Sequence, residues 1–117
     1  YDTGGLDLKS GRSMVEMKTD LSGAATVLSF LCGYAMSGGN KCITAICPFA
    51  ENSIGPDAIK PSDVITAYNG KTVEIGNTDA EGRLILADAL DYADEDVDRH
   101  EITVELDFSL VSNIGEF

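Results

Sequence analysis

The sequence predicts an α/β fold in which a mostly parallel sheet is flanked by helices. Short β-branched runs alternate with longer helical segments along the chain, and this alternation is typical of that class. The predicted order of elements is strand, helix, strand, hairpin, helix, strand, with no internal repeat. With 117 residues, of which 44% are hydrophobic and 24% charged, the chain has the size and composition of one globular domain.

Three elements are expected in the first half of the chain. Residues 1–12 are punctuated by glycine and indicate the end of a strand that enters a turn. Residues 22–36 are small and apolar with almost no polar side chain, which predicts a buried helix. Residues 41–48 (KCITAICP) are rich in β-branched side chains and end at a proline, so we predict a largely buried strand there.

The second half begins with a predicted hairpin. An Asn-Gly pair at positions 69–70 separates two short runs, residues 63–68 and 71–75, and such a pair is the strongest short-range hairpin signal. A second helix is predicted over residues 80–93, because leucine and alanine recur along one side of it. Residues 102–108 alternate apolar and polar side chains, which predicts a further strand.

The charge of the chain argues against two classes of partner. Asp and Glu total 20 against 8 Lys and Arg, which gives a net charge of −12 that repels nucleic-acid phosphates and anionic lipid headgroups. No apolar run approaches the roughly 20 residues that a membrane-spanning helix needs. We therefore expect neither a nucleic-acid partner nor a membrane.

The cysteines and the start of the chain bear on its location and completeness. Cys32, Cys42 and Cys47 include no C-x-x-C pair, so neither a disulfide framework nor a zinc knuckle is expected, and a reducing compartment is indicated. The sequence begins at Tyr1 with neither an initiator methionine nor a signal-peptide pattern. We therefore expect a cytoplasmic protein, and a fragment of a longer polypeptide.

Residues 77–83 (NTDAEGR) allow a structural and a functional interpretation. Thr78 and Glu81 match the S/T-x-x-E capping box, and acidic groups in the first turn of a helix are stabilised by the helix dipole. Alternatively, Asp79, Glu81 and Arg83 lie at a strand–helix junction, at the edge of the sheet where open α/β folds bind ligands. The local sequence favours neither interpretation over the other.

A resemblance favours the functional interpretation. Residues 77–90 (NTDAEGRLILADAL) resemble the signature of the leucyl aminopeptidase (cytosol aminopeptidase) family of dinuclear metallopeptidases. Other segments resemble family segments in the same order: residues 1–9 (F-D-T-G-G-L…K in the family), 17–25 (M-x-x-D-x-G-G-A-A), 49–52, 60–65 and 69–74. The resemblance covers roughly residues 1–93, and it implies that residues 1–117 are part of a metallo-aminopeptidase catalytic domain, truncated at both ends.

The resemblance also implies the residues of the site. Four carboxylates would bind two divalent ions, zinc or manganese with magnesium as a further option: Asp2, Asp20, Asp79 and Glu81. Several carboxylates are needed because two neighbouring cations repel each other, and anionic oxygens offset that repulsion. By position, Lys9 matches the family lysine that stabilises the developing oxyanion. Arg83 matches the arginine that holds a bicarbonate for proton transfer.

The function implied by the resemblance is di-metal-dependent hydrolysis of the N-terminal residue from peptides. Peptides are then the expected substrates and a homohexamer is the expected assembly, while the fragment alone is expected to be inactive. The alternative is a catalytically silent relative that serves as a structural or assembly protein. Two features motivate this alternative: residues 105–109 replace the family's A-T-L-T-G stretch, which lines the substrate pocket, and the family's metal-binding lysine before the Asp2 segment falls outside the chain.

Overall fold

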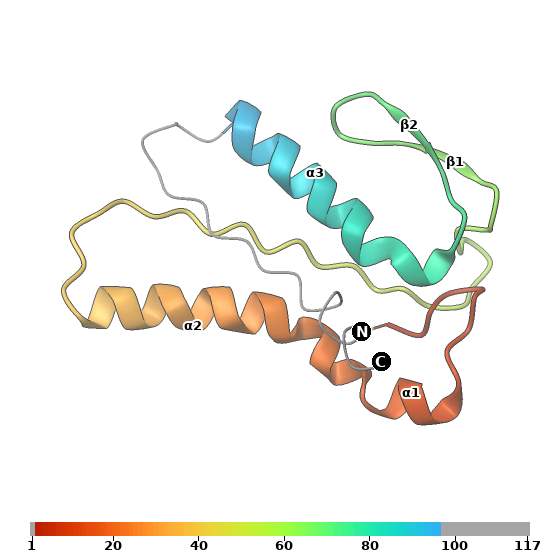
Figure 1. The fold of residues 1–117 in the computed structure, drawn as a ribbon, viewed down its shortest axis with the longest axis horizontal. Helices are drawn as coiled ribbons and strands as arrows, with labels where there is room; N and C mark the ends of the chain where they lie inside the picture. The colour runs from red at the N-terminus through yellow and green to blue at the C-terminus, as the bar shows by residue number, and fades with distance from the viewer. Residues whose placement is uncertain (1, 97–117) are drawn as a thin grey trace, which may run out of the picture.

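The computed structural model describes residues 2–96. Helices and one hairpin follow one another along this part of the chain (Figure 1). In order they are α1 (Gly11–Val15), a 3₁₀ helix (Met17–Leu21), α2 (Ser22–Met36), β1 (Val64–Thr66), β2 (Thr72–Glu74), a 3₁₀ helix (Thr78–Ala80) and α3 (Glu81–Asp96). The strand predicted at residues 102–108 lies outside the described residues.

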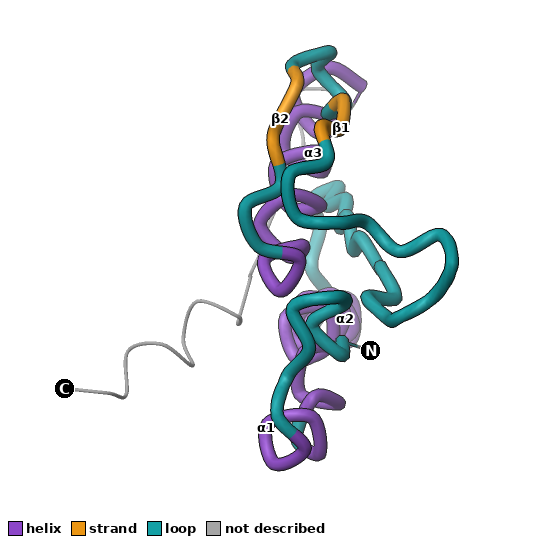
Figure 2. The backbone as a smooth tube through the Cα atoms, turned by 90° about the vertical axis from the view of Figure 1, so that its right-hand side faces the viewer, coloured by secondary structure: helices purple, strands orange, loops and turns teal. Residues whose placement is uncertain are grey.

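Two long helices and the chain between them form the framework of the structure. Helices α2 and α3 lie on opposite sides of residues 41–50, which run extended between them (Figure 1). A view turned by 90° shows the β1–β2 hairpin beside α3 (Figure 2). A cavity of about 80 Å³ is lined by all three segments, with Val27 from α2, Ile46 from the extended chain and Ile85 from α3. A small cavity therefore lies between the two helices and the extended chain.

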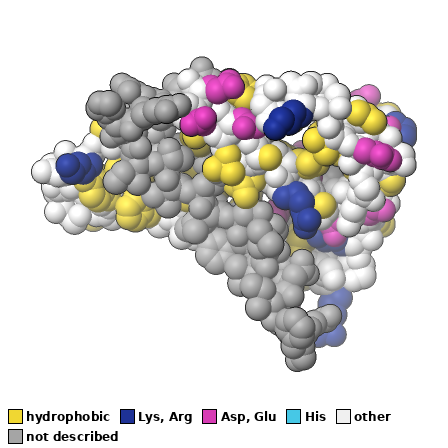
Figure 3. All heavy atoms as spheres, turned by 45° about the horizontal axis from the view of Figure 1, so that its top comes forward, with side chains coloured by type: hydrophobic (Ala, Val, Ile, Leu, Met, Phe, Trp, Pro, Cys, Tyr) yellow, Lys and Arg dark blue, Asp and Glu magenta, His cyan; other side chains and the backbone are white. Residues whose placement is uncertain are grey.

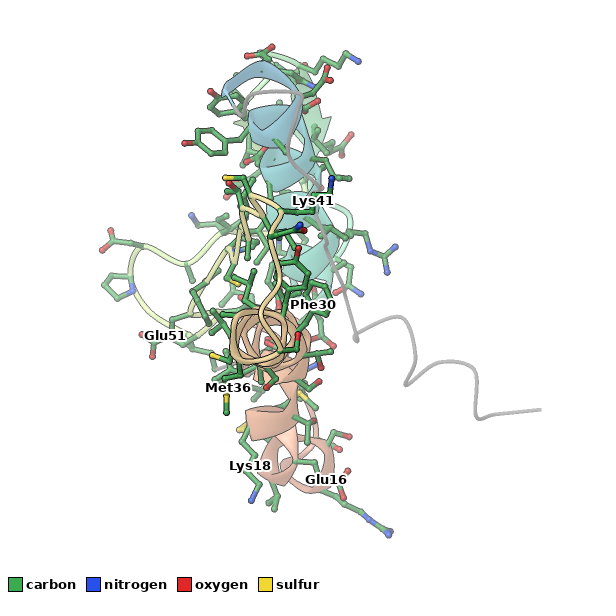
Figure 4. The ribbon with its side chains drawn as sticks, turned by 90° about the vertical axis from the view of Figure 1, so that its left-hand side faces the viewer. Glu16, Lys18, Phe30, Met36, Lys41 and Glu51 are labelled. Atoms are coloured by element: carbon green, nitrogen blue, oxygen red, sulfur yellow. The ribbon has the colours of Figure 1, made fainter. Side chains whose placement is uncertain are left out.

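Helix α2 confirms the predicted helix, but its predicted burial is wrong. It begins directly after the first 3₁₀ helix and ends at Met36, close to Gly38, which has a left-handed φ of +78°. Only Gly23 and Val27 of this helix are buried. Phe30 is 45% exposed, and Met36, at the C-terminal end, is 89% exposed (Figure 4). The helix packs against the described chain with one face only, so its apolar composition overstates its burial.

The core of the described chain is small. Its buried apolar side chains are Val27, Ile75 and Ala89. Apolar side chains also show on the surface among charged groups (Figure 3). The larger exposed ones include Leu6, Leu8, Val15, Leu28, Phe49, Ile54 and Tyr92. Much of the apolar content counted from the sequence therefore faces outward.

Within residues 2–96, the run at 41–48 forms no strand, so the prediction of a strand there is wrong for the described part of the chain. Residues 43–48 are half-buried and extended, but they belong to no strand. An extended run becomes a strand only when a neighbour pairs with its backbone hydrogen-bonding groups, and no described segment does so here. Asp2 and Asn52 form an isolated parallel bridge, and the sheet of the described residues is a small antiparallel pair, β1 and β2, in place of the mostly parallel sheet that we predicted.

The predicted hairpin is confirmed. Strands β1 and β2 pair antiparallel, and Gly70 in the turn between them has a φ of +80°, which glycine tolerates without strain. Two hydrogen bonds fix this turn to α3. The backbone N–H of Tyr68 donates to Asp88 at 2.9 Å, and the side-chain amide of Asn69 donates to Asp91 at 2.6 Å. The hairpin is therefore attached to the helix that carries part of the site.

The second predicted helix is confirmed as α3, which begins at Glu81 and buries Ala89. None of the helices within residues 2–96 combines the length and the apolarity needed to cross a membrane. The three cysteines are free thiols.

Candidate metal centre

The loop at the start of the chain wraps its backbone around the carboxylate of Asp2. Asp2 is 4% exposed, and its Oδ1 accepts a hydrogen bond from the backbone N–H of Gly4 at 2.7 Å. Gly4 has a φ of +85°, in the left-handed region that permits this tight turn. The backbone N–H of Thr3 donates to the carbonyl of Asn52 at 2.8 Å, which ties the loop to the end of the extended segment. The fold therefore holds this carboxylate in one place.

Lys9, at the end of this loop, forms an ion pair with the same carboxylate. Its backbone N–H donates to the carbonyl of Thr3 at 2.9 Å. Its ammonium nitrogen lies 3.0 Å from Oδ2 of Asp2 and 2.5 Å from Oδ1 of Asp79. Burial acts to lower the pKa of Lys9, but hydrogen bonds and charge interactions with Asp79 and Asp2 outweigh it and raise this pKa. Lys9 is therefore a fixed positive charge at neutral pH.

The pKa of Asp2 is lowered, which favours its charged form just as the raised pKa of Lys9 does. Burial acts to raise this pKa, but the N–H of Gly4 and the ammonium of Lys9 outweigh it, and the pKa falls below its ordinary value. Asp2 is therefore ionised at neutral pH and available as an anionic ligand.

The start of α3 is not arranged as the capping-box interpretation expects. The side chain of Asn77 caps this end by accepting a hydrogen bond from the backbone N–H of Asp79 at 2.9 Å. The hydroxyl of Thr78 turns to the first loop instead and donates to the carbonyl of Gly4 at 2.6 Å. The hydroxyl of Thr78 thus binds a distant backbone group instead of capping its own helix. The side chain of Glu81 lies near the carboxylates of Asp2 and Asp20.

Three of the expected ligands converge on one point. One carboxylate oxygen from each of Asp2, Asp20 and Glu81 lies within 4.8 Å of the other two. They come from three separate segments: the first loop, the 3₁₀ helix before α2, and the first turn of α3. Asp79 is joined to this group through Lys9, whose ammonium it shares with Asp2.

Arg83 forms no ion pair with the carboxylates of this cluster. It follows Glu81 by two positions on α3, and two positions correspond to about 200° around a helix axis. Its side chain is exposed and forms no ion pair with any residue in the described range. The guanidinium is therefore accessible to an anion from solution.

The charges of the cluster favour a bound cation. Burial raises the pKa of Glu81, and the nearby carboxylates of Asp2, Asp20 and Asp79 raise it further. Carboxylates this close to one another repel unless a positive charge lies between them. Their oxygens are ligands that magnesium, manganese and zinc all accept. The donor set therefore fits divalent cations.

Two residues of this centre are not predicted by the sequence. The side-chain amide of Asn52 contacts both Asp2 and Glu81, which lie 50 and 29 positions away. Asp7 pairs twice with Thr78, 71 positions away: its backbone N–H donates to the hydroxyl, and its carboxylate accepts from the backbone N–H. A single polar residue in a loop carries no spacing pattern, so only the tertiary structure reveals these contacts.

The sequence matches a family of known proteins. The model of the cytosol aminopeptidase family, catalytic domain, matches residues 1–106. The "Probable cytosol aminopeptidase" of Fusobacterium nucleatum is 54% identical over 92 residues, which cover 79% of this chain and 19% of the relative. That of Mycoplasma pneumoniae is 50% identical over 102 residues, covering 87% of this chain and 23% of the relative. The chain thus spans about a fifth of the length of these relatives.

Solved structures of related aminopeptidases and of a maturation enzyme also resemble this chain. The apo structure of leucyl aminopeptidase from Trypanosoma cruzi superposes with a TM-score of 0.75 at 38% identity, over 86% of this chain and 20% of that one. A bottromycin maturation enzyme in complex with Mn also gives a TM-score of 0.75, at 32% identity, over 98% of this chain and 26% of that one. Because the family model matches most of its length, the chain belongs to the cytosol aminopeptidase family, as part of its catalytic domain.

Proposed function

We propose that the protein carrying this sequence is a metallo-aminopeptidase that removes the N-terminal residue from peptides with two divalent metal ions. The observation that supports this most is the convergence of Asp2, Asp20 and Glu81, from three distant segments, within 4.8 Å. Membership of the cytosol aminopeptidase family supplies the reaction class. Because the chain spans about a fifth of its relatives, the isolated chain is expected to be inactive.

The metal ions are proposed to be held by Asp2, Asp20, Asp79 and Glu81. Manganese is the first choice, since one related structure is a complex with Mn, and zinc and magnesium accept the same oxygen donors. When bound, the ions would lower the pKa of a water molecule and polarise the carbonyl of the scissile bond. The four carboxylates supply the negative charge that offsets repulsion between two cations.

Lys9 is proposed to stabilise negative charge during the reaction, and Arg83 is proposed to assist proton transfer. Lys9 is protonated, and its position is fixed by Asp2 and Asp79, so it can stabilise negative charge that develops on the carbonyl oxygen. The exposed guanidinium of Arg83 can hold a planar anion by paired hydrogen bonds. We assign it a bicarbonate, which when bound would supply a group that can take up and return a proton during hydrolysis.

A metal titration tests the first half of the proposal. Mn²⁺ added to the 117-residue chain should bind, and the Asp20→Asn variant should bind more weakly, because it removes one charged ligand of the three that converge. Calorimetric titration measures both affinities. Asp57→Asn is the control, since it makes the same change at an exposed carboxylate outside the cluster. Equal affinity in all three chains would contradict the assignment.

Activity is tested in a hybrid enzyme. In it, residues 2–93 of this chain replace the corresponding segment of the Fusobacterium nucleatum relative, which supplies the rest of a catalytic domain. The hybrid should contain metal and hydrolyse an aminoacyl amide, as measured by metal analysis and release of the amine. A folded hybrid without activity, beside an active relative, would favour the catalytically silent alternative.

Peptide substrates, a cytoplasmic location and self-association into a homohexamer complete the proposal. The relatives are named cytosol aminopeptidases. Exposed apolar side chains such as Leu28, Phe49 and Ile54 are typical of surfaces that other polypeptide covers. Sedimentation of the complete protein at micromolar concentration should give a mass several times that of one chain, and a monomeric mass would contradict the assembly.

A further inference from the structure

The side chain of Asn52 lies between two of the proposed ligands. Its amide nitrogen is 2.9 Å from Oδ1 of Asp2, 2.7 Å from Oε2 of Glu81 and 2.8 Å from the carbonyl oxygen of Thr78. All three partners are acceptor oxygens that share the two N–H donors of the amide, so the NH₂ end must face them. The reversed orientation would place the amide oxygen against three oxygens. The surroundings therefore fix which end of the Asn52 side chain faces the cluster.

The backbone of Asn52 is also held in place. Its carbonyl accepts hydrogen bonds from both the backbone N–H of Thr3, at 2.8 Å, and the hydroxyl of Thr3, at 2.9 Å. Asp2 pairs with Asn52 in the isolated parallel bridge. On the other side, a Cβ added to Gly5 would lie 2.7 Å from Oδ1 of Asn52, so glycine leaves just enough room for this amide. The side chain thus extends from an anchored backbone into a closely fitted space.

We propose that Asn52 is a positioning residue, which holds one oxygen of Asp2 and one oxygen of Glu81 so that the two side chains can bind a shared divalent cation. This inference rests on the proposed function, because it takes both carboxylates to be ligands. Residues that hydrogen-bond to ligating carboxylates set the orientation of those ligands and thereby the affinity for the metal.

An amide suits this position because of its charge. Two anionic carboxylates from distant segments repel each other, and a donor between them offsets part of that repulsion. A neutral amide supplies two N–H donors without a positive charge that would compete with the cation. Lys9 differs in this respect, since its ammonium is charged and contacts Asp2 and Asp79 rather than Glu81.

The test compares two leucine variants of the 117-residue chain. Asn52→Leu keeps the approximate shape and removes the donors, and its affinity for Mn²⁺ should fall by about 10–100-fold, the usual effect of losing a partner of a metal ligand. Asn69→Leu is the matched control: Asn69 also donates its amide to a carboxylate, that of Asp91 at 2.6 Å, but outside the cluster. Calorimetric titration gives the affinities, and thermal unfolding in a chelator gives the stability of each variant.

The outcomes separate a positioning role from a structural one. A positioning role predicts weaker Mn²⁺ binding in Asn52→Leu alone, whatever the unfolding temperatures of the two variants. If Asn52→Leu lowers the unfolding temperature but binds Mn²⁺ as tightly as the unmodified chain, the inference is overturned and the proposed function stands. If the unmodified chain binds neither Mn²⁺ nor Mg²⁺, the proposed function fails and this inference fails with it.

A measurement on the unmodified chain covers the case in which Asn52→Leu does not fold. The side-chain amide protons of Asn52 should exchange with solvent more slowly than those of the exposed Asn40. When diamagnetic Mg²⁺ is added, the side-chain amide signals of Asn52 should shift and those of Asn40 should not. NMR of the ¹⁵N-labelled chain detects both effects. Exchange of the Asn52 protons as fast as those of Asn40 would overturn the inference.

Discussion

Replacing Arg83 with Ala should leave the metal content of the hybrid enzyme unchanged and lower its turnover by about 10²–10⁴-fold, the usual span for losing general acid–base help. A protonated guanidinium cannot coordinate a cation, and Arg83 forms no ion pair within residues 2–96, so its removal takes away no ligand. What it removes is the proposed site for the bicarbonate that carries the proton. Metal analysis and amide hydrolysis on the same preparation measure both quantities.

Glu81→Ala is the matched comparison, and it should lose metal as well as turnover. The carboxylate of Glu81 lies within 4.8 Å of those of Asp2 and Asp20, so it is placed to contact any cation that they bind. Its loss leaves less negative charge to offset the repulsion between two cations. Both substitutions lie in the first turn of α3, so both introduce alanine at the same end of the same helix. Loss of metal from Arg83→Ala as complete as that from Glu81→Ala would contradict both assignments.

The sequence predicts the elements that depend on local signals. Helix α2 follows from a run of small apolar residues, helix α3 from apolar periodicity and the hairpin from an Asn-Gly pair, and all three signals act within a short stretch of sequence. Burial of α2 and pairing of residues 41–48 depend on what packs against them, and the sequence of an element does not contain its neighbours. The apolar run at residues 41–48 therefore gives an extended, half-buried segment, but no strand within the described part of the chain.

In the candidate site, too, the sequence predicts some features and only the tertiary structure reveals others. A family motif points to the four carboxylates and Lys9, and the fold brings Asp2, Asp20 and Glu81 together from segments up to 79 positions apart in the printed sequence. The motif did not predict what Thr78 does. Its hydroxyl matches a local cap in the sequence, yet a buried hydrogen bond to Gly4 at 2.6 Å takes its place. Such competition between local and tertiary partners is decided by burial, which a sequence pattern does not record.

Replacing Gly4 with Ala should destabilise the chain far more than the same change at Gly70. Both residues have a positive φ, +85° at Gly4 and +80° at Gly70, so alanine pays a left-handed backbone penalty of about 1–2 kcal/mol at either position. At Gly70 nothing lies within 4 Å of the added Cβ, and this penalty should be the whole effect. At Gly4 the added Cβ would clash with the backbone oxygen of Asp7 and lie 3.0 Å from the backbone nitrogen of Lys9.

The clash at Gly4 cannot be relieved by a side-chain rotation, because the atoms in the way belong to the backbone of the same loop. The loop must shift, and the hydrogen bond from the Gly4 N–H to Asp2, at 2.7 Å, and the bond from Thr78 to its carbonyl should weaken together. We therefore expect Gly4→Ala to lose several kcal/mol, about 3 or more, and to bind Mn²⁺ more weakly as Asp2 moves, while Gly70→Ala keeps its affinity. Urea unfolding and Mn²⁺ titration of both variants measure the two effects. Equal losses of stability, with Mn²⁺ affinity unchanged in both, would mean that the first loop does not hold Asp2 as described.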